Sequence, residues 1–446
     1  MIHSVFFICI DVIEEKHLAR LDYNSLSQQS LMELLVAQLD EKSDLIDAEG
    51  HFLDISEWPG VHCNADGDIV ELNLQVINAT TKVDLQWLPK TLTTISGAYC
   101  QISGSLNFEI FPRQLETIDF EGNEFVGTLH ASHLPPNLRE LCLFQNRLKG
   151  HVDFKALPRV LETLSLGSNE LDGTIDFSIL PPTMIFLDIR ENNFSGSINL
   201  NHLPSSLLEI VLSKNKFTGV VDLGHLPSTI AIVHIDNNAF VGTITLDMLP
   251  DSLRELEFHT NSFTKLPWHL VAACIRHLDL SNNAITGSID IASVPRTVEQ
   301  VNCDDNEFDG PIALECLPPR TVCFRAVNNF LTGSIVLTHF PATLEVVNLE
   351  NNCLSGSVDC TQLPSALEIL HLGSNFLTGT VNLRSLPENL GFLFLYENNF
   401  SHLLLPQAFP DCVEQVSLRG NESTGDFSIV CDGNNLQGLR ETTLEL

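Results

Sequence analysis

Histidine and acidic side chains that could bind a metal ion or titrate near neutral pH recur in the middle of this chain. They are related by steps of two residues or of 22 or 23 residues: His234, Asp236, Glu255, Glu257, His259, His277 and Asp279. Imidazole and carboxylate groups are ligands for transition-metal ions, and a histidine near carboxylates gains a proton more readily. We interpret the set as a solvated patch of mixed charge. A metal site and a pH-dependent partner contact are the two alternatives.

No enzyme motif accompanies these residues. The sequence contains no H-E-x-x-H, no G-x-S-x-G, no P-loop and no G-x-G-x-x-G between a strand and a helix. Its glycines instead recur at the same regular interval, which indicates a role in structure. We therefore predict a protein that is not an enzyme, with no catalytic residue, no bound metal and no cofactor.

A second group of side chains is apolar or aromatic and lies towards the C-terminal end. They are related by steps of two or 23 residues: Val346, Ile369, His371, Phe392, Phe394 and Tyr396. If this spacing brings them together on one surface, they form an exposed patch of the kind that aromatic residues anchor to partners. We predict that these six residues bind a partner. The alternatives are that residues 401–410 or the C-terminal tail cover them as local core, and that their exposure is incidental.

A repeat runs through the chain and sets these spacings. Residues 161–171 read LETLSLGSNEL, which fits L-x-x-L-x-L-x-x-N-x-L, and the motif returns at a period of about 23 residues. Its asparagine recurs at this constant step, with a single shorter step from Asn261 to Asn283: Asn123, Asn146, Asn169, Asn192, Asn215, Asn238, Asn261, Asn283, Asn306, Asn329, Asn352, Asn375, Asn398 and Asn421. Extending the spacing backwards adds Cys100 and Ile77, so we count about 16 repeats.

The composition of each repeat explains how it folds. The position five before the asparagine is always apolar and the position three before it nearly always so, which places both on one face of a strand. Stacked repeats bury that face as a continuous core, whereas a single repeat cannot. A buried asparagine at each turn can satisfy unpaired backbone groups, so we predict that the fourteen asparagines form a structural ladder. The outward strand positions vary and would line a binding surface.

Three segments carry a family resemblance. Residues 25–40 have a helical apolar pattern that Ser27 or Ser30 can cap, and residues 58–63 read WPGVHC before a D-G turn and a strand. Residues 375–381 read NFLTGTV and match an N-x-L-x-G-x-I extension. The chain resembles plant-type leucine-rich-repeat ectodomains, including receptor-like proteins and polygalacturonase inhibitors, and protist leucine-rich-repeat surface antigens. The family cap carries a cysteine before the tryptophan, whereas this chain has only Cys9 upstream.

The resemblance implies a leucine-rich-repeat solenoid, a horseshoe with a parallel β-sheet on its concave face and little helix outside the N-terminal cap. We expect a degraded signal or disordered start at 1–20, the cap at 21–68, the solenoid at 69–430, and a C-terminal cap or tail at 431–446. The implied function is recognition of a protein, peptide or glycan partner on the concave face. An intracellular leucine-rich-repeat scaffold or effector-like protein is the alternative.

Charge and composition limit the partners. The formal net charge of −34 argues against nucleic acid and anionic membranes, and no apolar stretch is long enough to span a bilayer. The twelve cysteines show no disulfide framework, although Cys412 and Cys431 could join as a terminal staple. Glycosylation sequons at Asn78, Asn193 and Asn399 favour a secreted or cell-surface protein over a cytoplasmic one. The sequence specifies neither the ligand nor the oligomeric state.

Overall fold

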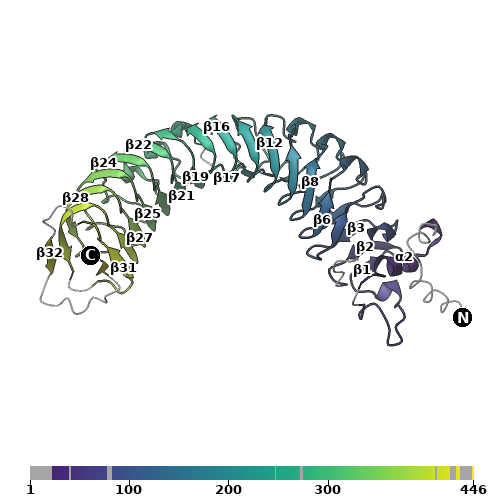
Figure 1. The fold of residues 1–446 in the computed structure, drawn as a ribbon. Helices are drawn as coiled ribbons and strands as arrows, with labels where there is room; N and C mark the ends of the chain where they lie inside the picture. The colour runs from purple at the N-terminus through teal and green to yellow at the C-terminus, as the bar shows by residue number, and fades with distance from the viewer. Residues whose placement is uncertain are drawn as a thin grey trace. The chain divides into compact units, whose positions relative to one another are not determined.

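The structure is a computed structural model that describes residues 23–39, 42–77, 83–246, 248–271, 275–406, 409–421, 428–431 and 444–445. The chain divides into two compact units, Met1–Asp172 (unit 1) and Gly173–Leu446 (unit 2). The repeat spacing contains no signal for this division. Each unit is a solenoid of stacked turns with parallel strands, which confirms the predicted fold class (Figure 1). The expected start at 1–20, together with Cys9 and Asn78, lies outside the described residues.

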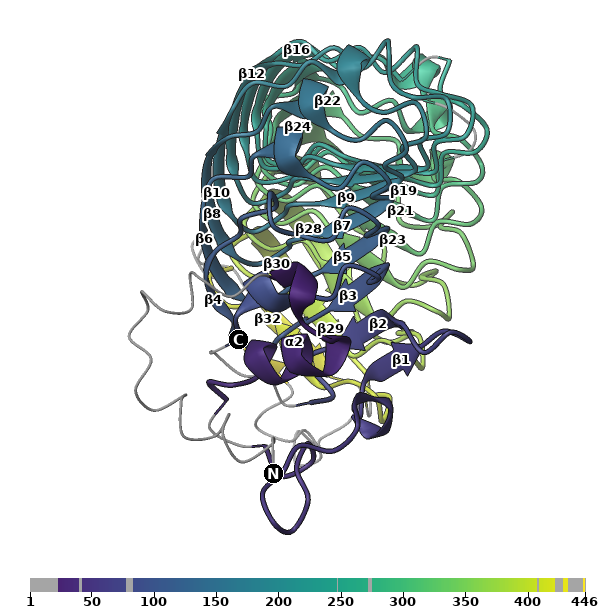
Figure 2. The same cartoon turned by 90° about the vertical axis from the view of Figure 1, so that its right-hand side faces the viewer.

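Near the start of the described part of unit 1, a short helix lies beside the first strands (Figure 2). Helix α2 (Gln28–Leu35) starts at Ser27, whose hydroxyl accepts the N–H of Ser30 at 3.1 Å. It is shorter than the predicted 25–40 because the backbone N–H of Ala37 bonds three residues back, to Leu34, and not four. Among the described residues α2 is the only α-helix. No helix in this part of the chain is long and apolar enough to span a membrane.

The cap of unit 1 is attached to the solenoid by hydrogen bonds. The side chain of Gln28 accepts the N–H of Ile69 at 2.7 Å and donates to Asp68 at 2.7 Å. Trp58 is buried, and its indole N–H donates to the carbonyl of Leu53 at 3.0 Å. Short elements complete the cap: η3 (Tyr23–Ser25), η4 (Ile55–Glu57) and β1 (Val61–Cys63), which runs antiparallel to β2 (Ile69–Asn73).

Two parallel layers of strands form the rest of unit 1. The inner layer contains β2, β3 (Thr94–Ser96), β5 (Thr117–Asp119), β7 (Glu140–Cys142) and β9 (Thr163–Ser165). The outer layer contains β4 (Ser103–Ser105), β6 (Glu124–Gly127), β8 (Arg147–His151) and β10 (Glu170–Gly173). Single 3-10 turns connect the layers: η5 (Leu85–Trp87), η6 (Ala131–His133) and η7 (Phe154–Ala156).

Unit 2 repeats this plan, with its inner strands on the concave side and its outer strands on the convex side (Figure 1). The inner strands are β11 (Phe186–Asp188), β13 (Glu209–Val211), β15 (Ile232–His234), β17 (Glu255–Glu257), β19 (His277–Asp279), β21 (Gln300–Asn302), β23 (Cys323–Arg325), β25 (Val346–Asn348), β27 (Ile369–His371), β29 (Phe392–Phe394) and β31 (Gln415–Ser417). Near the C-terminus, β33 (Leu444–Glu445) adds a parallel strand beside β31.

The outer strands of unit 2 are β12 (Asn193–Ser197), β14 (Lys216–Gly219), β16 (Ala239–Thr243), β18 (Ser262–Lys265), β20 (Thr286–Gly287), β22 (Glu307–Pro311), β24 (Phe330–Gly333), β26 (Cys353–Gly356), β28 (Phe376–Asn382), β30 (Asn399–Leu405) and β32 (Ser428–Cys431). The outer layer is interrupted between β18 and β20, where the step between asparagines is one residue shorter and the glycine is missing. The 3-10 turns are η8 (Phe177–Ile179), η9 (Trp268–Leu270), η10 (Ile291–Ser293) and η11 (Leu314–Cys316).

The asparagines form a ladder between the layers. The side-chain amide of Asn238 donates to the carbonyls of Leu212, Ile235 and Asp236 at 3.0–3.2 Å, and its oxygen accepts the N–H of Phe217 at 3.0 Å. Bonds of the same kind join successive turns along both units. Because each asparagine satisfies groups of its own turn and of the turn before, it holds neighbouring turns in register.

Stacked rings fill part of the core of unit 2. Phe194, Phe217, Phe240 and Phe263 occupy the position two after the asparagine in successive turns, with ring centroids 6.3–6.4 Å apart and planes tilted by 4–18°. Each ring is fully buried. The repeat thus places identical side chains over one another, and their contacts add to the energy of apolar burial.

Candidate functional site

Strands β25, β27 and β29 place the predicted partner-binding residues on the concave side of unit 2. Val346 pairs with Ile369, and Ile369 with Phe392, in one row of the parallel sheet. His371 pairs with Phe394 in the next row, and Tyr396 follows two residues after Phe394. We call these six residues, Val346, Ile369, His371, Phe392, Phe394 and Tyr396, the aromatic patch; all of them are half-buried.

The rings of the aromatic patch contact one another. The centroid of His371 lies 4.8 Å from that of Phe394 and 5.4 Å from that of Tyr396. Phe394 also stacks on Phe392 with centroids 6.1 Å apart. The patch is therefore one continuous surface, held together by ring contacts that each contribute about 0.5–1.5 kcal/mol.

A polar network lies at one edge of the patch. The hydroxyl of Tyr396 donates to the carboxylate of Glu350 and lies 3.2 Å from Nε2 of His371. Nδ1 of His371 lies 3.7 Å from the same carboxylate. Burial and the bond to Glu350 raise the pKa of Tyr396 to about 12. Burial lowers the pKa of His371, the Glu350 carboxylate opposes that shift, and Arg325 adds to it. Both shifts favour the neutral forms of Tyr396 and His371 at neutral pH.

A missing side chain makes this network possible. Gly373 occupies the equivalent position in the turn between Glu350 and Tyr396, and a Cβ atom there would lie 2.8 Å from Cζ of Tyr396. Such a contact is too close for two carbon atoms, so a larger residue would move the ring. The glycine lets the tyrosine reach across a whole turn of the solenoid.

The described part of segment 401–410 does not fold over the patch. Its first five residues belong to β30, which pairs with β28 in the outer layer. The neighbour of β29 on the concave side is β31, and the strand after that is β33. Around the patch, the described residues therefore continue the sheet without covering its face.

The predicted staple between Cys412 and Cys431 stays a prediction. Cys412 carries a free thiol, whereas the side chain of Cys431 lies outside the described residues.

The histidine and acidic residues from the middle of the chain also come together on the concave side. His234 on β15 pairs with Glu257 on β17, which pairs with Asp279 on β19. Asp236 and His259 follow β15 and β17, with Nε2 of the histidine 3.6 Å from the carboxylate. This cluster is separate from the aromatic patch, since strands β19, β21 and β23 lie between them.

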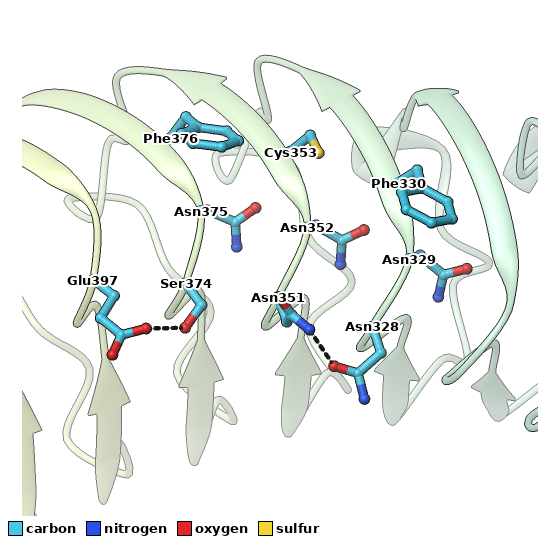
Figure 3. Close-up of a pocket in the computed structure, with 10 residues that line it drawn as sticks. All are labelled: Asn328, Asn329, Phe330, Asn351, Asn352, Cys353, Ser374, Asn375, Phe376 and Glu397. Carbon is cyan, nitrogen blue, oxygen red and sulfur yellow. Dashed lines mark hydrogen bonds between the residues drawn. The ribbon is translucent and has the colours of Figure 1, made fainter.

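Sequence reasoning missed Glu350 and Gly373, and it also missed a groove on the side of unit 2. The groove has a volume of about 530 Å³ and is flanked by Phe330 and Phe376, each 57% exposed (Figure 3). Its floor is the asparagine ladder. Figure 3 shows its ten lining residues: Asn328, Asn329, Phe330, Asn351, Asn352, Cys353, Ser374, Asn375, Phe376 and Glu397. The sequence did contain a signal for this groove: an aromatic residue directly follows a ladder asparagine at Phe330 and Phe376, a position whose side chain points outward.

A family model described as "Leucine Rich repeat" matches residues 271–289, and the register and ladder extend the same repeat through both units. The chain has a leucine-rich-repeat fold. The sequence matches none of the curated proteins with which it was compared.

Solved structures resemble this leucine-rich-repeat protein in fold. The plant peptide hormone receptor RGFR1, in complex with RGF2, superposes with a TM-score of 0.60 at 21% identity, covering 77% of this chain and 64% of the receptor chain. A TDR receptor gives 0.56 at 21% identity, covering 81% and 75%. The functional domain of InlJ from Listeria monocytogenes gives 0.62 at 20% identity, covering 78% and 70%. At these identities the likeness concerns the fold.

Proposed function

We propose that this leucine-rich-repeat protein is a non-enzymatic recognition module whose aromatic patch binds an extended peptide or a segment of a partner protein. The observation that carries the proposal is the continuous aromatic surface on β25, β27 and β29, which adjoining inner strands extend. Half-exposed aromatic clusters in water commonly mark partner sites. The similarity to RGFR1, a plant peptide hormone receptor, supports a peptide as the ligand class.

The polar edge of the patch favours a particular partner chemistry. Glu350 is a carboxylate beside apolar rings, and its exposed fraction of 29% leaves room for a second hydrogen-bond donor. The whole chain carries a formal charge of −34. A partner with an apolar or aromatic anchor followed by a lysine or arginine would fit both features, because the anchor fills the patch and the cation approaches Glu350.

We propose that the protein acts outside the cell or at its surface. The sequon asparagines Asn193 and Asn399 are half-buried residues at the start of β12 and β30, in the outer layer. Asn421 also begins a sequon, but it is fully buried in the ladder and should stay unmodified. The mass of the natural protein should fall after glycosidase treatment. An unchanged mass, with the protein recovered from the cytosol, would favour the intracellular alternative.

The binding proposal can be tested by selecting peptides against the full chain from a random peptide library. The selected peptides should share an apolar or aromatic anchor next to a basic residue. Replacing Phe394→Ser and Tyr396→Ser together should weaken their binding by about 1,000-fold, since an aromatic anchor at an interface contributes about 2 kcal/mol and two contribute about 4 kcal/mol. Isothermal titration with the best peptide measures the change.

The matched control replaces the two exposed phenylalanines that flank the groove on the side of unit 2, Phe330→Ser and Phe376→Ser. Both rings belong to unit 2 and are exposed, but they lie outside the patch. The control variant should bind the peptides like the unmodified protein. If the patch variant also binds unchanged, or if no peptide is enriched, the patch is not the partner site.

A further inference from the structure

Two imidazole and three carboxylate side chains lie close together on the concave side of unit 2, on β15, β17 and the residues that follow them. We call His234, Asp236, Glu255, Glu257 and His259 the histidine–carboxylate cluster. Two overlapping triads make it up: His234, Glu255 and Glu257 in one, and Asp236, Glu257 and His259 in the other. In each triad one nitrogen or oxygen atom per residue lies within 4.8 Å of the other two.

The first triad surrounds the imidazole of His234. Nε2 of this histidine lies 3.1 Å from Oε1 of Glu255, and Nδ1 lies 4.0 Å from Oε2 of Glu257. The histidine side chain is only 18% exposed, whereas the two carboxylates are 47% and 40% exposed and can rotate. Bonds of about 2.0–2.2 Å to one ion would bring such ligand atoms about 3–3.5 Å apart, so small side-chain rotations suffice.

The second triad has the better-supported ligands. Asp236 is 5% exposed, and its two oxygens accept hydrogen bonds from Ser213 at 2.5 Å and Asn237 at 2.8 Å. Nδ1 of His259 lies 2.9 Å from the hydroxyl of Thr260, which leaves Nε2 directed at Asp236, 3.6 Å away. A hydrogen bond to the second ring nitrogen is the usual support of a metal-binding histidine.

The charge of the cluster favours a cation. Among the residues that the structure describes, the ion-pair partners of Asp236, Glu255 and Glu257 are the two histidines alone. The adjoining strand adds another carboxylate, Asp279, which pairs with Glu257. When the histidines are neutral, several negative charges therefore lie together without a lysine or arginine, and their field attracts a divalent ion.

From this geometry we propose that the histidine–carboxylate cluster binds a divalent transition-metal ion of the zinc class, with Glu257 as the ligand common to both triads. Imidazole with carboxylate suits zinc, cobalt, nickel and manganese, whereas calcium and magnesium prefer sites made of oxygen alone. The site is distinct from the aromatic patch and does not depend on the proposed partner.

A comparison cluster in unit 1 shows why the histidines matter. Asp119, Glu121 and Cys142 also offer three ligand atoms close together, but no imidazole. Burial raises the pKa of Cys142 to about 11, so its thiol stays protonated at neutral pH. Glu121 moreover accepts the hydroxyl of Tyr99. This group therefore offers no imidazole, and its thiol would have to lose a proton before it could bind an ion.

The test is titration of the metal-free full chain with Zn²⁺, followed by calorimetry and by the imidazole nitrogen signals of labelled histidine. We expect saturable binding that millimolar Mg²⁺ does not displace, with shifts of the His234 and His259 signals. The double variant His234→Asn/His259→Asn should bind Zn²⁺ more than about tenfold more weakly, since loss of the groups that merely support metal ligands already costs about 10–100-fold.

The matched control is His225→Asn, because His225 forms an exposed pair with the single carboxylate of Asp222 at 3.3 Å. It should leave Zn²⁺ binding unchanged. Glu257→Gln, which retains both histidines, should lose affinity like the double variant, and circular dichroism of each metal-free variant should match the unmodified protein. Equal Zn²⁺ affinity in the unmodified chain, the double variant and Glu257→Gln would overturn the proposal, as would no measurable binding by the unmodified chain.

Discussion

Tyr396 donates its hydroxyl hydrogen to Glu350, a residue 46 positions earlier in the chain and two turns away in the solenoid. The bond passes over Gly373 in the intervening turn. It therefore spans three successive turns at the edge of the aromatic patch, those of β25, β27 and β29. The patch is therefore tied together by side chains as well as by backbone pairing.

Replacing Tyr396→Phe removes this bond while keeping the ring. Because the acceptor is charged and part-buried, we expect the free energy of unfolding to fall by about 1–2 kcal/mol. Denaturant unfolding measures the change. Tyr99→Phe is the control, since the hydroxyl of Tyr99 also donates to a carboxylate, Glu121, but the side chain is exposed. Its effect should be clearly smaller, because a bond between exposed groups contributes little to stability; equal effects would mean that burial of the network contributes nothing.

Replacing Gly373→Ala should displace the ring of Tyr396, because the new Cβ would lie 2.8 Å from Cζ. With the ring displaced, the tyrosine pKa should fall from about 12 towards its ordinary value of 10. Absorbance of tyrosinate during a pH titration measures this shift. Gly391→Ala is the control, because its Cβ would meet no atom closer than 3.7 Å. An unshifted tyrosine titration in Gly373→Ala would show that the ring does not need the glycine.

His371 should make stability depend on pH. Burial lowers its pKa below the ordinary 6.5, so the unfolded chain binds a proton before the folded protein does. Stability should therefore be greatest above pH 6.5 and fall as the pH drops from 6.5 towards the lowered pKa. Denaturant unfolding of the unmodified protein and His371→Gln between about pH 8 and pH 5 tests this. The unmodified protein should lose stability relative to the variant, and a difference that does not change with pH would contradict the assignment.

Asn238→Ala should destabilise unit 2 by about 1–3 kcal/mol, because it leaves buried backbone groups of two turns without partners. The side chain makes four hydrogen bonds to Leu212, Phe217, Ile235 and Asp236. The control is Asn389→Ala, an exposed asparagine whose side chain donates to one carbonyl. Thermal unfolding compares the two variants. An equal melting temperature for both variants would show that the ladder does not contribute to stability.

The cysteines should differ in reactivity according to their burial. Cys303 and Cys360 are buried, and burial raises the pKa of both thiols, that of Cys360 to about 12. The thiols of Cys63 and Cys316 are exposed. Mass spectrometry after brief alkylation at neutral pH should find label on Cys63 and Cys316, whereas Cys303 and Cys360 should be labelled only after unfolding in denaturant. Early labelling of Cys360 would mean that this part of the core opens readily.

The sequence was sufficient to predict which residues become neighbours in adjacent turns. A nearly constant repeat length sets the register, so His371 had to lie beside Phe394 and His234 beside Glu257. Apolar residues at fixed positions before each asparagine determined which face is buried. These relations are local and repetitive, and for that reason a pattern in the sequence is enough to predict them.

The sequence did not reveal a conformational constraint in front of each ladder asparagine. In unit 2 the residue before it has a positive φ and, apart from Gly420, is not glycine, as at Lys214 (54°) and Asn351 (54°). Its N–H donates to the next turn, as Lys214 does to Asp236 at 3.1 Å. Stacking therefore stabilises this conformation even at residues that rarely adopt it, such as Lys214, whereas asparagine or aspartate, which tolerate it better, precede only some of the ladder asparagines.

Tertiary structure alone decided the features that join more than two turns or depend on side-chain direction. Tyr396 reaches Glu350 only because Gly373 lies between them, and the repeat pattern describes adjacent turns, not turns two apart. Whether His259 and Asp236 approach within 3.6 Å likewise depends on rotamers and on the bond from Nδ1 to Thr260. The repeat determines where each Cβ lies, whereas packing and hydrogen bonding in three dimensions determine which atoms meet.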